Sequence, residues 1–160
     1  MKEVMTKQQV QAIIEKYSRS EERLVQMLLD VQEASGQNYI PKDTAIILAE
    51  ELNIPLTRVY DVITFYSMFN TEPKGRYIIE VCKSAPCHVN KPQNVISLFE
   101  KILGIKLNET TPDKMFTLQQ SSCFGACDIA PAVKIGDSVY GNLDEEKITA
   151  LINNLREVQN

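Results

Sequence analysis

The sequence contains no tryptophan, a single histidine and only 7% aromatic residues among its 160 residues. Its net charge is −4 and it contains no cluster of lysine or arginine, which argues against nucleic acid as a partner. No stretch approaches the roughly 18 consecutive apolar residues of a membrane-spanning helix, and the first residues lack the apolar core of a signal peptide. We therefore expect a cytoplasmic protein that makes no direct contact with a membrane.

Cysteine is scarce as well, and its four occurrences fall into two close pairs. Cys82 and Cys87 form a C-x₄-C pair in VCKSAPCHVN, and Cys123 and Cys127 form a C-x₃-C pair in SSCFGAC. In a reducing compartment such pairs more often bind a metal or act in redox chemistry than form structural disulfides. A disulfide within so short a loop would also add little stability, because it removes little chain entropy.

The spacing of the pairs leaves more than one kind of site open. Structural zinc sites and thioredoxin-type dithiols favour C-x₂-C, which neither pair has, although zinc stays possible on spacing alone. The wider loops suit a binuclear iron-sulfur cluster, whose sulfurs need nearby N–H donors, and the loops supply four candidates: Lys83, Ser84, Ala85 and Gly125. A Rieske centre requires two histidines, and the chain has only His88.

The apolar periodicity changes near residue 70. Before this point apolar residues recur at intervals of three and four in separate runs, which predicts four short helices. Thr6 and Gln9 have the form of a capping box at the start of the first. The segment NTEPKGR, residues 70–76, combines proline and glycine and predicts a boundary between two domains, residues 1–72 and 73–160.

The second half alternates between strand and helix patterns. We expect strands or hairpins over residues 76–82, 115–121 and 132–141, and helices over residues 92–104 and 144–158. The resulting order β-α-β-β-β-α is that of a thioredoxin-like domain. The predicted fold class is therefore α/β, a four-helix N-terminal segment followed by a thioredoxin-like domain with both cysteine pairs on loops after strands.

Residues 64–69, TFYSMF, are rich in aromatic residues and methionine. Such a segment can fill a core or form a patch that faces a partner. We expect these side chains to lie in the core.

Together the segments IIEVCKSAPCHV, LGIKLNETTPDKMFTL and CFGACDIAPAVKIGDSVYGNL resemble the thioredoxin-like 2Fe-2S ferredoxin family, the small subunits of NADH dehydrogenases. Residues 40–69 are similar to the helical N-terminal part of that family. Its members also include gamma subunits of NADH-dependent, electron-bifurcating iron hydrogenases and of NAD-dependent formate dehydrogenases. The resemblance implies one 2Fe-2S cluster per chain, with four ligands: Cys82, Cys87, Cys123 and Cys127.

The resemblance also implies a one-electron transfer subunit of an oxidoreductase complex that is not catalytic alone. The chain has neither a G-x-G-x-x-G motif after a strand nor a P-loop. FMN and NAD(H) are accordingly expected on a partner flavoprotein subunit, accompanied by a further iron-sulfur or catalytic subunit. Residues 1–72 would then be a docking domain and residues 73–160 the cluster domain.

Several parent complexes are compatible with this resemblance. The composition is rich in isoleucine, lysine and asparagine, as in AT-rich genomes of anaerobes, which favours an electron-bifurcating hydrogenase. The alternatives are a respiratory NADH:quinone oxidoreductase, an NAD-dependent formate dehydrogenase, and a stand-alone ferredoxin or redox sensor. A free carrier needs only the cluster domain, so the helical N-terminal half favours a subunit of a complex.

Overall fold

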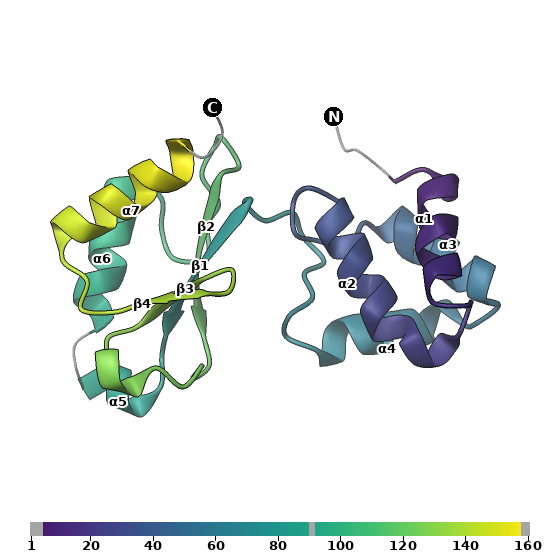
Figure 1. The fold of residues 1–160 in the computed structure, drawn as a ribbon, viewed down its shortest axis with the longest axis horizontal. Coiled ribbons are helices and arrows are strands. Elements are labelled where there is room, and N and C mark those ends of the chain that lie inside the picture. The colour runs from purple at the N-terminus through teal and green to yellow at the C-terminus, as the bar shows by residue number, and fades with distance from the viewer. Residues whose placement is uncertain (1–4, 90–91, 158–160) are drawn as a thin grey trace. The chain divides into compact units, whose positions relative to one another are not determined.

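The computed structural model describes residues 5–89 and 92–157 (Figure 1). The chain divides into two compact units, residues 1–74 and 75–160, and each unit has its own apolar core. Within the described ranges, no helix has the length and apolar character needed to cross a membrane.

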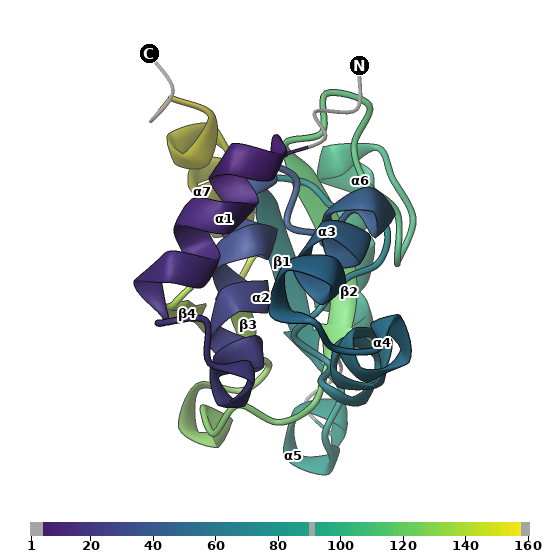
Figure 2. The ribbon, with the colours of Figure 1, turned by 90° about the vertical axis from the view of Figure 1, so that its right-hand side faces the viewer.

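Helices make up the first unit (Figure 2). Their bounds are α1 (Lys7–Lys16), a 3₁₀ turn (Glu21–Arg23), α2 (Leu24–Ala34), α3 (Lys42–Leu52) and α4 (Leu56–Phe65). The capping box at the start of α1 is confirmed, because Thr6 Oγ1 accepts from the Gln9 N–H and Gln9 Oε1 accepts from the Thr6 N–H. Each helix turns one apolar face inward, and fully buried members of the core include Val10, Met27 and Leu48.

The expectation that residues 64–69 lie in the core is wrong for three of the four large side chains. Phe65 is 79% exposed, Tyr66 39% and Met68 44%, and only Phe69 is buried. The reason is helical periodicity: α4 buries Val59 and Ile63, so a residue two positions after Ile63 falls on the opposite face.

The second unit contains a mixed sheet with helices. The strands are β1 (Tyr77–Cys82), β2 (Phe116–Ser121), β3 (Val133–Ile135) and β4 (Ser138–Tyr140), and the helices are α5 (Ala85–Val89), α6 (Pro92–Leu103) and α7 (Glu145–Glu157). The strand order is β2-β1-β3-β4, with β1 parallel to β2 and the other pairs antiparallel. This arrangement confirms the α/β class and is consistent with a thioredoxin-like fold. The short helix α5 was not predicted.

Helices α6 and α7 lie side by side against the sheet (Figure 1). Phe99 of α6 and Ile148 of α7 are fully buried with Ile79 of β1 and Leu118 of β2. This core fixes β1 and β2 as a pair, and the loops that follow them begin from a rigid base.

Threonine side chains hold the start of β2. Thr111 Oγ1 accepts from the Phe116 N–H at 3.0 Å and donates to Asp113, a hydrogen bond that is the main cause of the lowered pKa of Asp113. Thr117 is fully buried, and its Oγ1 accepts from the Gly75 N–H at 2.6 Å. The ETTPD motif and the neighbouring threonine are therefore structural, and they set where β2 begins.

Gly75 approaches the backbone of β2 too closely for any side chain. A Cβ atom at this position would lie 2.6 Å from the carbonyl carbon and 2.8 Å from the nitrogen of Phe116. We predict that Gly75→Ala lowers the free energy of unfolding by about 1–3 kcal/mol, the usual cost of overpacking. Urea unfolding followed by circular dichroism checks this, with Lys74→Ala as the control. Equal stability of the two variants would contradict it.

Candidate metal centre

The parallel pairing of β1 with β2 brings the two cysteine pairs to one edge of the sheet. Cys82, the last residue of β1, is in register with Ser121, the last residue of β2. Beyond the strands, the Lys83 N–H still donates to the Ser121 carbonyl oxygen at 3.1 Å. The two segments that carry the remaining cysteines therefore leave the sheet side by side.

The four predicted ligands lie close enough to influence one another's ionisation. Cys123 Sγ lies 3.9 Å from Cys127 Sγ, and Cys82 affects the pKa values of both Cys87 and Cys123. All four are free thiols, so no disulfide competes for them. Three of the four follow or end a strand as expected, whereas Cys87 lies within the unpredicted helix α5.

The two pairs differ sharply in their surroundings. Cys82 and Cys87 are buried, with 2% and 1% of their surface exposed, whereas Cys123 and Cys127 are exposed. An apolar layer packs against the buried pair, and it consists of Phe124, Ala126, Ile129, Ala130 and Ala132. The site thus has an inner side in an apolar environment and an outer side at the surface.

Backbone N–H groups point at two of the sulfurs. Burial raises the pKa of the Cys87 thiol, and a hydrogen bond from the Ala132 backbone opposes this rise. The backbone of Gly125 is the largest cause of the lowered pKa of Cys123, and the Ser84 side chain also hydrogen-bonds to this sulfur. Gly125 has φ +89°, a conformation that favours glycine. These contacts stabilise negative charge on sulfur, which is the form that binds metal.

The donor set fits a binuclear iron-sulfur cluster. In the described part of the chain, no three His, Cys, Asp or Glu side chains are grouped closely enough to enclose a single ion. A 2Fe-2S cluster instead requires four thiolates, two at each iron, together with hydrogen-bond donors around the sulfurs. The paired thiols, with Ser84, Gly125 and Ala132 as donors, supply both.

The sequence did not reveal how the loop that carries Cys127 is held in place. This cysteine opens a 3₁₀ turn, Cys127–Ile129, and the Asn142 N–H donates to the Ile129 carbonyl oxygen at 3.3 Å. A Cβ atom on Gly141 would lie 2.3 Å from that same oxygen. The glycine at the end of β4 therefore permits close approach of the turn. The sequence indicates this contact only through the presence of a glycine at the end of the predicted hairpin.

We predict that Gly141→Ala displaces the Cys127 turn and reduces cluster occupancy by at least twofold. The added methyl group collides with backbone, which cannot move without shifting Cys127. Iron and acid-labile sulfide per chain, together with the EPR spectrum of the reduced protein, provide the measurement. Gly136→Asn is the control, because it changes a glycine of the same hairpin that has φ +58° and open space around it. Full occupancy with an unaltered spectrum would refute the prediction.

Two pairs of thiols at the ends of parallel strands define an iron-sulfur protein built on a thioredoxin-like fold. The chain belongs to the thioredoxin-like [2Fe-2S] ferredoxin family, whose model matches residues 10–156. The predicted family is thereby confirmed, and the cofactor is a 2Fe-2S cluster.

Curated relatives match along most of the chain. It is 42% identical to a subunit of the NADH-quinone oxidoreductase of Rickettsia felis over 141 residues, covering 88% of this chain and 84% of the relative. It is 31% identical to a subunit of the NADH-quinone oxidoreductase of Rhizobium meliloti over 153 residues, covering 96% and 90%. These relatives are named as subunits of oxidoreductase complexes.

A solved structure shares the fold. The NAD⁺-reducing [NiFe]-hydrogenase in its H₂-reduced state matches with a TM-score of 0.69 and 22% identity, over 87% of this chain. The chain spans 23% of the matched hydrogenase chain. At this identity the likeness concerns the fold alone.

Proposed function

We propose that this chain is the 2Fe-2S electron-transfer subunit of an NADH-oxidising complex. Its cluster ligands are Cys82, Cys87, Cys123 and Cys127. The observation that carries this proposal is the meeting of the two cysteine pairs beyond the ends of the parallel strands β1 and β2. The names of the curated relatives support the kind of complex.

When bound, a four-thiolate 2Fe-2S cluster accepts and donates one electron at a time. Cys82 and Cys87 would hold the cluster from the buried side of the site, where the apolar residues around them restrict water. Cys123 and Cys127 lie on the outer side, where a partner can approach. Reduction adds negative charge, so the hydrogen bonds to Cys123 from Gly125 and Ser84 stabilise the reduced form, whereas burial disfavours it.

The electrons come from a second subunit in this proposal. The sequence carries no dinucleotide-binding motif, so hydride chemistry on NAD(H) and its division into single electrons belong to an FMN-containing flavoprotein. Residues 1–72 are the docking domain and residues 73–160 the cluster domain, and a further iron-sulfur or catalytic subunit completes the complex.

The relatives' names favour the respiratory NADH:quinone oxidoreductase as the parent complex, whereas the composition favours a bifurcating hydrogenase. The hydrogenase structure adds no weight to either, since it reports the fold alone. Identifying the other subunits that accompany the flavoprotein would distinguish the quinone oxidoreductase from the hydrogenase.

We expect the anaerobically purified chain to contain one 2Fe-2S cluster, because four thiols converge at one site. Iron and acid-labile sulfide should be equal in amount, and dithionite should produce a rhombic EPR signal. Cys127→Ala should abolish most of this signal, whereas Ser122→Ala, at an exposed neighbouring position, should retain it. A colourless protein that holds zinc would refute the electron-transfer function.

We also expect a tagged chain purified from its own cells to bring down an FMN-containing subunit. NADH should then reduce the cluster in the complex but not in the isolated chain, because only the partner oxidises NADH. Mass spectrometry identifies the further subunits and separates quinone reductase from hydrogenase. Recovery of the chain alone, with an intact cluster, would favour the stand-alone ferredoxin.

A further inference from the structure

The two exposed cysteines of the site, Cys123 and Cys127, are close enough to react with each other. We call them the outer pair, and Cys82 and Cys87 the inner pair. Both outer cysteines are free thiols at the surface, and their Sγ atoms lie 3.9 Å apart. A disulfide requires a sulfur-to-sulfur distance of about 2.0 Å, so the two side chains need to approach by only about 2 Å.

The loop between the outer cysteines has room for this approach. Gly125 lies midway between them with φ +89°, and a Cβ atom at this position would meet no atom within 4 Å. Cys127 opens the 3₁₀ turn that is tied to β4 through the Asn142 N–H and the Ile129 carbonyl oxygen. The movement therefore falls on the Cys123 side of the loop, where glycine gives the backbone freedom to adjust.

The inner pair is protected from a dissolved oxidant. Cys82 and Cys87 have only 2% and 1% of their surface exposed, and the apolar layer described above packs against them. The backbone of Cys82 is also held in the sheet, because its N–H donates to the Ala132 carbonyl oxygen at 3.1 Å. Oxidation of a thiol requires access to its sulfur, so a small polar oxidant meets the outer pair first.

We propose that Cys123 and Cys127 form a reversible disulfide when a peroxide meets the chain before its cluster is inserted, and that this disulfide blocks insertion. The inference concerns regulation of the proposed cluster site and therefore rests on the proposed function. The disulfide would occupy two of the four ligands, and the inner pair alone cannot complete the four-thiolate set of a 2Fe-2S cluster.

The oxidation balances with peroxide as the only co-reactant. Hydrogen peroxide converts one outer thiol to a sulfenic acid and is released as water. The second thiol attacks that sulfur, the S–S bond forms, and the hydroxyl group leaves as a second water molecule. The two thiols lose two electrons and two hydrogen atoms in total. A dithiol reverses the reaction by exchange and becomes a disulfide itself, which is possible because the outer pair is exposed.

The test uses the full chain after a chelator and dithiothreitol have removed its cluster and both reagents have been washed away. Equimolar hydrogen peroxide should lower the count of reactive thiols in the unfolded chain from about four to about two. Peptide mapping by mass spectrometry should place the disulfide between Cys123 and Cys127. Transfer of a cluster from a 2Fe-2S-loaded scaffold protein, without free thiol, should be at least tenfold slower than into the reduced chain, and dithiothreitol should restore it.

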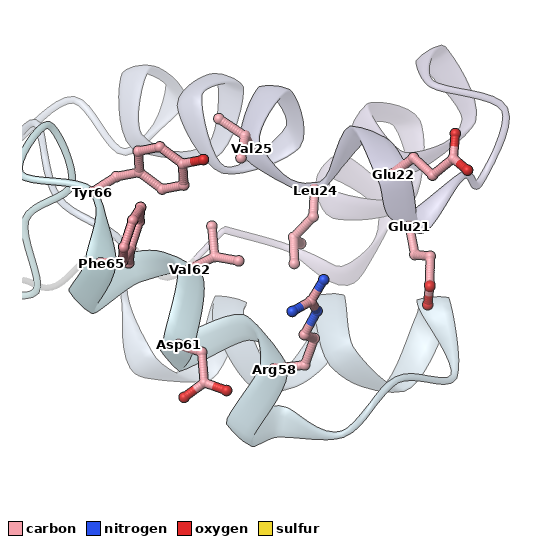
Figure 3. Close-up of a pocket in the computed structure, with 9 residues that line it drawn as sticks. All are labelled: Glu21, Glu22, Leu24, Val25, Arg58, Asp61, Val62, Phe65 and Tyr66. Carbon is pink, nitrogen blue, oxygen red and sulfur yellow. The ribbon is translucent and has the colours of Figure 1, made fainter.

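Substitutions separate the proposed bond from general oxidative damage. Cys127→Ala should form no internal disulfide, and its Cys123 should pass to sulfinic or sulfonic acid, which dithiothreitol does not reverse. Cys87→Ala should still form the outer disulfide. Phe65→Ala is a control in the other unit, where it truncates an exposed ring at a pocket whose lining residues contain no sulfur (Figure 3). Its thiol count should match that of the wild type. Circular dichroism verifies that each variant is folded.

Four outcomes would overturn the inference in whole or in part. Four reactive thiols after peroxide treatment exclude the disulfide. A bond mapped to Cys82 and Cys87, or between the two pairs, assigns the reaction to the wrong thiols. Unchanged cluster transfer into the disulfide form removes the regulatory role and leaves the electron-transfer function standing. A reduced wild-type chain that accepts no 2Fe-2S cluster refutes the proposed function, and the block on insertion with it, even where the outer disulfide forms as expected.

Discussion

The parallel, in-register pairing of β1 with β2 is the constraint on which the rest of the site depends. Parallel strands end at the same edge of a sheet, so Cys82 and Ser121 lie opposite one another and the segments beyond them run together. Antiparallel pairing of the same strands would place the two cysteine pairs at opposite edges. The buried helices α6 and α7 hold that pairing through a continuous apolar core, which makes the site a property of the fold rather than of the loops alone.

Burial then divides the four thiols into two kinds. The inner pair lies under an apolar layer, and in the proposed site this burial would favour the less charged, oxidised state of the cluster. The outer pair lies at the surface. Backbone donors oppose the effect of burial, as the Ala132 N–H does at Cys87. In the proposed site, burial and hydrogen bonding would together set the reduction potential of the cluster. Both depend on the backbone conformation of the loops that contain Gly125 and Gly141.

The sequence predicted those features that depend on residues close together in the chain. Alternating apolar residues identified the strands, and the spacing of the cysteines excluded a thioredoxin-type dithiol. Helix α5 was missed because five residues are too few to show a period, and Pro86 near its start resembles a loop signal. The contact of Gly141 with Ile129 could not be predicted from the sequence, because it joins segments that meet only after the sheet has formed.

The error at residues 64–69 is the informative one. The apolar composition of residues 64–69 predicted burial, whereas the helical period that buries Val59 and Ile63 requires Phe65 to point outward. The structure follows the helical period. Natural sequences rarely leave such a conflict between levels without a gain elsewhere. Phe65, Tyr66 and Met68 therefore remain at the surface of the first unit, where they add apolar area without joining its core.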